Sequence, residues 1–147
     1  MTAQGNRQRI LDFCKTFYSL DLENSMAFYA DDVDYVSHVP VDILPHLGQR
    51  RGKSEVRNTF AQVYSRYSSM RYDIQVMVAE EDRVALINRV FFQKALRDRI
   101  VQMDIANFYT LRDGLIVKQR EFLDSYDLVQ QVLEIDIASS LRLTSPD

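Results

Sequence analysis

Residues 115–124 alternate like a β-strand, and they carry side chains that could move protons. Arg120, Phe122 and Asp124 fall on one face of such a strand, and Glu121 falls on the other. If the first face borders an apolar pocket, burial raises the pKa of Asp124 and suits its carboxyl group to proton shuttling. The strand therefore predicts a candidate general base at Asp124.

Two histidines lie in an irregular segment that contains two prolines, and they are the other candidates for acid–base chemistry. His38 either lines the mouth of a cavity, where it would act as an acid or base, or has no catalytic role. His46 is expected to be a surface loop residue. Because a metal site needs three or more ligands, the sequence predicts no metal site. The single cysteine, Cys14, lies among apolar residues and is expected to be buried.

Apolar residues at helical spacing predict three helices before residue 68. The first ends near Leu20, the second is short and capped by Asp21, and the third begins near Ser54. A short strand is expected at residues 33–37, after the break made by two aspartates.

After residue 69 the periodicity changes to that of extended chain. Four β-prone runs follow, with turns at residues 81–82 and 112–114, and a last short helix is expected within residues 126–137; the runs cover residues 72–78, 83–92, 99–111 and 115–124. Helices followed by a strand meander predict an α+β domain over residues 1–147, in which a curved antiparallel sheet is wrapped by three N-terminal helices. Such a cone leaves a hollow for a small molecule.

Composition narrows the possible partners. The chain has 147 residues, 46% hydrophobic and 27% charged, with a net charge of −3. Neutralising phosphates needs a surplus of Lys and Arg, so no nucleic-acid partner is expected. No signal peptide or membrane-length apolar window occurs, and the expected location is the cytoplasm.

Four phrases resemble one known family. They are residues 28–33 (FYADDV), 52–56 (GKSEV), 108–117 (FYTLRDGLIV) and 120–124 (REFLD). Their order and spacing resemble the SnoaL-like and ketosteroid-isomerase-like proteins of the nuclear transport factor two superfamily. The resemblance spans roughly residues 8 to 130 and implies the cone fold, a cavity and a homodimer formed through the outer sheet face. It implies no single activity, because this fold hosts many.

The ketosteroid isomerase site departs from the family's pattern at three positions. Its base aspartate falls on Ser37, its oxyanion-hole tyrosine on Phe13 and its second acid on Asn107. Steroid isomerisation by that mechanism is therefore not expected. Asn107 either donates a hydrogen bond to a ligand oxygen or is a polar residue satisfied inside the cone.

The limonene epoxide hydrolases match in part. Their water-holding tyrosine and asparagine fall on Tyr35 and Ser37, and their base aspartate falls on Asp124. Their arginine–aspartate pair falls on Arg89 and Phe91, so the proton donor that epoxide opening needs is replaced.

These resemblances imply a cofactor-independent enzyme that acts by proton transfer on a hydrophobic, oxygenated small molecule, as an isomerase or cyclase. Its catalytic residues would be Asp124, Tyr35, Arg89 and His38; the pocket would be lined by Phe13, Phe17, Ser37, Phe60, Phe91, Asn107, Tyr109 and Phe122. One alternative is an Arg89–Asp124 ion pair that only closes the sheet. Another is a non-catalytic ligand-binding or dimerisation module of the same fold.

Overall fold

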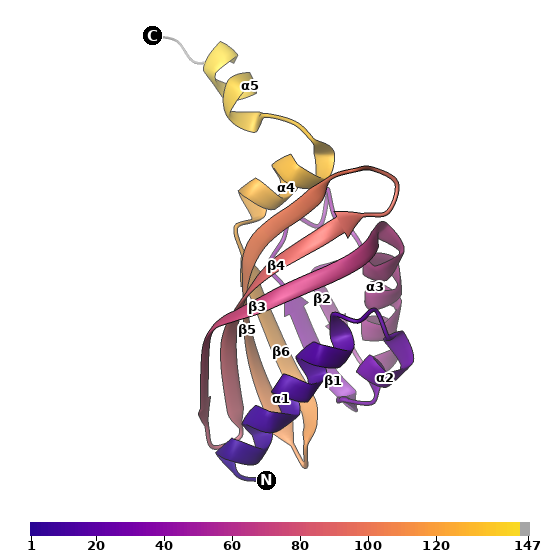
Figure 1. Cartoon of the computed structure of the whole chain (residues 1–147), viewed down its shortest axis with the longest axis vertical. Coiled ribbons are helices and arrows are strands. Elements are labelled where there is room, and N and C mark those ends of the chain that lie inside the picture. Colours follow the sequence, from indigo (N-terminus) through magenta and orange to yellow (C-terminus); the bar gives the residue numbers. More distant parts are fainter. Residues whose placement is uncertain (145–147) are drawn as a thin grey trace.

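The computed structural model describes residues 1–144, which form five helices and a six-stranded sheet (Figure 1). The predicted domain runs to residue 147, so its last three residues lie outside the described part. The elements are α1 (Ala3–Phe17), α2 (Leu22–Met26), β1 (Tyr29–Ser37), β2 (Gln49–Arg51), α3 (Lys53–Arg66), β3 (Tyr67–Glu80), β4 (Arg83–Lys94), β5 (Ile100–Arg112), β6 (Leu115–Leu123), α4 (Ser125–Leu133) and α5 (Ile137–Thr144).

The sheet has the strand order β2-β1-β6-β5-β4-β3, and α1, α2 and α3 precede its long strands in the chain (Figure 1). The predicted α+β fold with a curved sheet is confirmed. The sheet is antiparallel except for one pair, because β1 runs parallel to β6. β1 also begins at Tyr29, before the two aspartates that the sequence suggested as a break. These aspartates are exposed and lie where the β1–β6 register shifts, so the strand continues past them.

The core lies between the concave face of the sheet and the helices. Along β4, alternate residues such as Val84, Leu86 and Val90 point inward and are almost fully buried. Ile10 and Cys14 on α1 pack in the same core, which confirms the expected burial of the cysteine. This alternation decides which side chains of each strand can reach a cavity.

α4 follows β6 directly and packs against β5. The Gln131 side chain binds the main chain of Gln102 twice: its Oε1 accepts from the amide at 2.8 Å and its Nε2 donates to the carbonyl at 2.7 Å. Lys94 Nζ donates to the Gln131 carbonyl at 2.8 Å, near the C-terminal end of the helix. Basic groups at this end also interact favourably with the helix dipole.

The expected helix within residues 126–137 is two helices. α4 ends at Leu133, because Glu134 adopts a left-handed conformation with φ of 55°. α5 then starts at Ile137 and extends beyond the rest of the molecule (Figure 1). Among the helices of residues 1–144, none has the length and apolar character needed to cross a membrane.

Candidate functional site

A cavity opens between the sheet, α1, α3, α4 and the segment that precedes β2. Its volume, counted as the space that the centre of a water molecule can occupy, is about 80 Å³. Since one water needs roughly 10–15 Å³ on this measure, the cavity has room for several waters or a small organic group. Most of its walls are aromatic or aliphatic. Its lining consists of Phe13, Phe17, Tyr18, Tyr35, Leu44, His46, Leu47, Phe60, Val63, Arg66, Tyr67, Phe92, Met103, Ile105, Asn107, Tyr109, Gln119, Glu121, Leu123, Leu128 and Val132.

Glu121 is the only carboxylate in the lining of this cavity, as described for residues 1–144. It projects from β6, and its Oε1 accepts a hydrogen bond of 2.7 Å from Ser37 Oγ at the end of β1. Burial raises the pKa of Glu121, while hydrogen bonds from Ser37 and Asn107 act in the opposite direction. A carboxyl group whose pKa is raised in this way is suited to take up a proton and release it again.

A chain of side-chain hydrogen bonds fixes the polar floor next to Glu121. Tyr29 donates to Gln119 Oε1 at 2.6 Å, and Gln119 Nε2 donates to Asn107 Oδ1 at 2.9 Å. Because the Asn107 oxygen is occupied in this way, its amide nitrogen is left to donate to Glu121. Asn107 is therefore satisfied inside the cone, the second of the two roles that the sequence left open, and it also holds the carboxylate of Glu121.

Tyr35 lies beside this carboxylate in the cavity wall. Its side chain is buried and packs edge-to-face on Phe60, with ring centroids 5.8 Å apart. Burial raises the pKa of Tyr35 well above its usual value, and the nearby negative charge of Glu121 acts in the same direction. The phenol therefore stays protonated at neutral pH. A side-chain hydrogen bond links its hydroxyl to Ser37, and the O–H can rotate to donate into the cavity instead.

His46 lies inside the molecule, and the expectation of a surface loop residue is wrong. The residue is only 6% exposed, and its Nδ1 is buried without a hydrogen-bond partner. Its main-chain carbonyl accepts a hydrogen bond of 2.9 Å from Thr59 Oγ1 on α3, which ties the loop to the helix. Burial lowers the pKa of His46 to about 4, and the positive charges of Arg66 and Arg50 add to this effect. Irregular segments have no periodicity from which such an inward position could be predicted.

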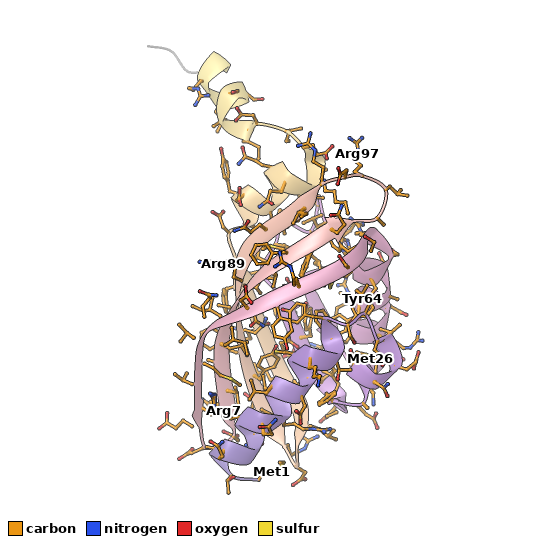
Figure 2. All side chains as sticks on the ribbon, viewed as in Figure 1. Met1, Arg7, Met26, Tyr64, Arg89 and Arg97 are labelled. Atoms are coloured by element: carbon orange, nitrogen blue, oxygen red, sulfur yellow. The ribbon has the colours of Figure 1, made fainter. Side chains whose placement is uncertain are left out.

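Asp124 and Arg89 do not reach the cavity, which corrects their expected placement. Asp124 is exposed and caps α4, with Oδ1 accepting from the Asp127 amide at 3.1 Å. Arg89, labelled in Figure 2, pairs instead with Asp104, with Nε–Oδ1 2.9 Å, and both side chains are about half exposed. The Arg89–Asp124 ion pair is therefore not formed.

His38, Phe91 and Phe122 lie outside the cavity as well. The ring of His38, an exposed residue, stacks on that of Phe122, with centroids 4.3 Å apart. Phe91 stacks under Arg71, whose guanidinium carbon is 4.5 Å from the ring centroid. Each of the two faces of β6 carries both polar and apolar residues, so the hydrophobic pattern could not show which face lines the cone. The face with Glu121 points inward, and the face with Phe122 points outward.

Five of the predicted pocket residues line the cavity, as does the catalytic candidate Tyr35; the five are Phe13, Phe17, Phe60, Asn107 and Tyr109. Ser37 is buried next to the wall, where it binds Glu121. Sequence reasoning missed Glu121, Gln119 and Arg66, and the alternation on β6 carries no signal that could have identified the first two. Across residues 1–144, no three His, Cys, Asp or Glu side chains come together as metal ligands.

Comparison with known proteins gives the same architecture. A structure of a protein provisionally named an isomerase, from Rhodopseudomonas palustris, superposes with a TM-score of 0.80 at 24% identity, over 86% of this chain and 97% of that one. TerC, co-crystallised with polyporic acid, gives 0.77 at 20% identity, over 88% and 98% of the two chains. A protein provisionally named a SnoaL-like polyketide cyclase, from Jannaschia sp. CCS1, gives 0.77 at 12% identity, over 92% and 96%.

At these identities the superpositions establish the fold alone. No curated protein matches the sequence. The family model of the SnoaL-like domain, however, matches residues 10–119, which is most of the chain and ends just before the strand segment that carries Glu121. The chain therefore belongs to the SnoaL-like domain family.

Proposed function

We propose that this protein is a cofactor-independent enzyme that transfers a proton within a hydrophobic, oxygenated small molecule, in the manner of an isomerase or cyclase. The observation that carries the proposal is the one carboxylate that residues 1–144 place in the cavity lining: its pKa is raised, and Ser37 and Asn107 hold it in a mostly apolar cavity. Perturbed carboxyl groups in closed apolar pockets are typical of general bases. The names of the fold neighbours, an isomerase and a polyketide cyclase, support the same reaction class.

The proposed reaction starts with an enolisable ketone. Glu121 removes a proton from the carbon next to the carbonyl; the C–H bond breaks, an O–H bond forms on Glu121, and the electron pair moves to the carbonyl oxygen. Tyr35 donates a hydrogen bond to that enolate oxygen. In an isomerase, Glu121 returns the proton to another carbon. In a cyclase, the enolate carbon attacks a second carbonyl group and the resulting alkoxide takes up the proton.

Hydrogen exchange tests this proposal without knowledge of the natural substrate. The wild-type protein is expected to accelerate deuterium incorporation into 2-tetralone in D₂O, followed by proton NMR. Glu121→Gln keeps the shape of the side chain and removes the base, so the protein-dependent rate should fall by about 10²–10⁴-fold. Asp124→Asn is the matched control, because this carboxylate caps α4 outside the cavity and its loss should leave the rate unchanged.

The alternative is a ligand-binding module without catalysis. A small cavity with mostly apolar walls can hold a hydrophobic ligand without any reaction. It predicts that wild type and Glu121→Gln exchange the ketone at the same rate as buffer. That result would remove the catalytic proposal.

A further inference from the structure

We propose that Arg66 and His46 form an anion-binding subsite in the cavity, so that the natural ligand is an apolar molecule that carries a carboxylate or a comparable anionic group. The subsite stands on its own geometry. Only the orientation of the ligand, with its reactive carbon at Glu121, rests on the proposed function.

Arg66 is an exposed residue that lines the cavity, and no group in residues 1–144 pairs with its charge. It is the last residue of α3, and its carbonyl accepts a hydrogen bond of 2.9 Å from the Ala95 amide in the β4–β5 connection. The residue is therefore anchored at the end of the cavity where β4 and β5 are joined. Its guanidinium makes no hydrogen bond or ion pair with any residue from 1 to 144, and because Arg66 is exposed, its charge lies where the cavity meets solvent. A guanidinium in this position is suited to a bidentate bond with a carboxylate.

His46 adds a hydrogen-bonding group to the same wall. Within residues 1–144 no protein group bonds to either nitrogen of its ring, and the ring is buried against the cavity. Nδ1 is covered by protein atoms, whereas Nε2 is not among the fully buried atoms without a partner, so Nε2 is the ring nitrogen that can bond to a ligand in the cavity. Because the imidazole is neutral at pH 7, it offers an N–H donor, while the charge comes from Arg66.

The carboxylate of Glu121, the second charged group in the cavity lining, lies away from Arg66. Glu121 sits on β6 between β1 and β5, and no ion pair joins it to Arg66 in the part of the chain that the structure describes. Arg66 directly precedes β3, which is three strands from β6 in the sheet order. A ligand anion would be repelled by Glu121 and attracted by Arg66. The cavity therefore selects one end-to-end orientation of an amphipathic acid.

Two matched probes test the subsite by isothermal titration calorimetry at low salt. The anionic probe is 3-phenylpropionate, and 3-phenylpropionamide has nearly the same shape without the charge. Wild type is expected to bind the carboxylate more tightly than the amide. Arg66→Gln should weaken carboxylate binding on the order of 10-fold and leave amide binding unchanged, since a charge-assisted bond is lost. Arg66→Lys should retain part of the preference for the carboxylate, because the charge remains without the planar fork.

Arg7→Gln is the charge-matched control. Arg7 lies on α1 at the opposite end of the molecule from Arg97, which belongs to the connection that anchors Arg66 (Figure 2). Its substitution should change neither affinity. His46→Phe keeps the bulk of the ring and removes its nitrogens, and it should weaken the carboxylate several-fold more than the amide.

The subsite is overturned if wild type binds both probes equally, if Arg66→Gln weakens both to the same extent, or if neither probe binds at millimolar concentration. These failures are separate from failure of the proposed function. Glu121→Gln should bind 3-phenylpropionate at least as well as wild type. A protein that prefers the carboxylate and does not exchange 2-tetralone would keep the subsite and lose the catalytic role.

Discussion

At the scale of single residues, Glu121 holds an ionisable group where ionisation is costly. Its pKa is raised in the folded protein, so the folded state binds the proton more tightly than the unfolded chain does. The contribution of Glu121 to stability is complete below its unfolded pKa and is lost as the pH rises through the folded pKa. Neutral pH is therefore the condition in which this carboxylate destabilises the fold.

Glu121→Gln should accordingly stabilise the protein at pH 7 and not at pH 4. The amide has no charge to bury, and the Ser37 hydroxyl can rotate to remain its partner. We expect the Tm to rise on the order of 2–4 °C at pH 7, which corresponds to roughly 1 kcal/mol in a domain of this size. The difference from wild type should shrink as the pH approaches 4. Thermal melts across this range measure it, and equal Tm values at every pH would show that Glu121 is solvated.

The residues of the site were predictable to different degrees. The aromatic walls, Tyr35 and Asn107 followed from helical stripes, strand positions and resemblance, because bulky apolar residues with a regular period are directed inward. Glu121 was not predicted, since Glu121 and Asp124 lie on opposite faces of the β6 segment and the inward face had to be known to choose between them. Both neighbours of this strand place apolar residues on each face, so only tertiary packing selects the register.

At the scale of elements, α4 depends on its cap rather than on a catalytic role for Asp124. The carboxylate accepts from the Asp127 amide, one of the free donors of the first turn. Asp124→Ala should therefore lower the free energy of unfolding by about 0.5–2 kcal/mol, while Asp124→Asn, another good cap, should change it little. Urea unfolding followed by circular dichroism measures both. A loss of 3–5 kcal/mol in Asp124→Asn would instead indicate a buried ion pair.

Most elements were predictable from periodicity. The three N-terminal helices, the four long strands and the turns at Glu81 and Asp113 were expected, and both turn residues adopt positive φ. Two features were not. β2 is only three residues long, so it has no period of its own and exists because it pairs with β1. The division between α4 and α5 depends on the left-handed conformation of Glu134, a residue type that gives no signal for it.

At the scale of the whole molecule, the outer sheet face carries an apolar patch that suits a second copy of the chain. Phe108 and Phe122 are 52% and 38% exposed and meet edge-to-face at 5.9 Å, and Val78, 60% exposed, borders the same hollow. Contiguous apolar surface of this kind is typical of protein interfaces. We propose the homodimer that the family resemblance implies, with a total buried area above about 1,000 Å².

Sedimentation at micromolar concentration tests the dimer. Phe108→Glu should convert it to a monomer, because the added charge would be buried without a partner. Leu96→Glu is the matched control: this leucine is 97% exposed in the β4–β5 connection and should not affect assembly. A monomeric wild type at this concentration would count decisively against the outer face as an interface.

The tyrosines around the cavity have a further consequence in alkali. Burial raises the pKa of Tyr18, Tyr29, Tyr35 and Tyr109 well above the value of an exposed phenol. Above pH 10 the unfolded chain therefore binds fewer protons at these four positions than the folded chain, and stability falls with rising pH. Ionisation of these buried phenols is costly in the folded protein. The phenolate absorbance of these four tyrosines should therefore rise in the step that coincides with unfolding, so that their alkaline titration reports the loss of the core.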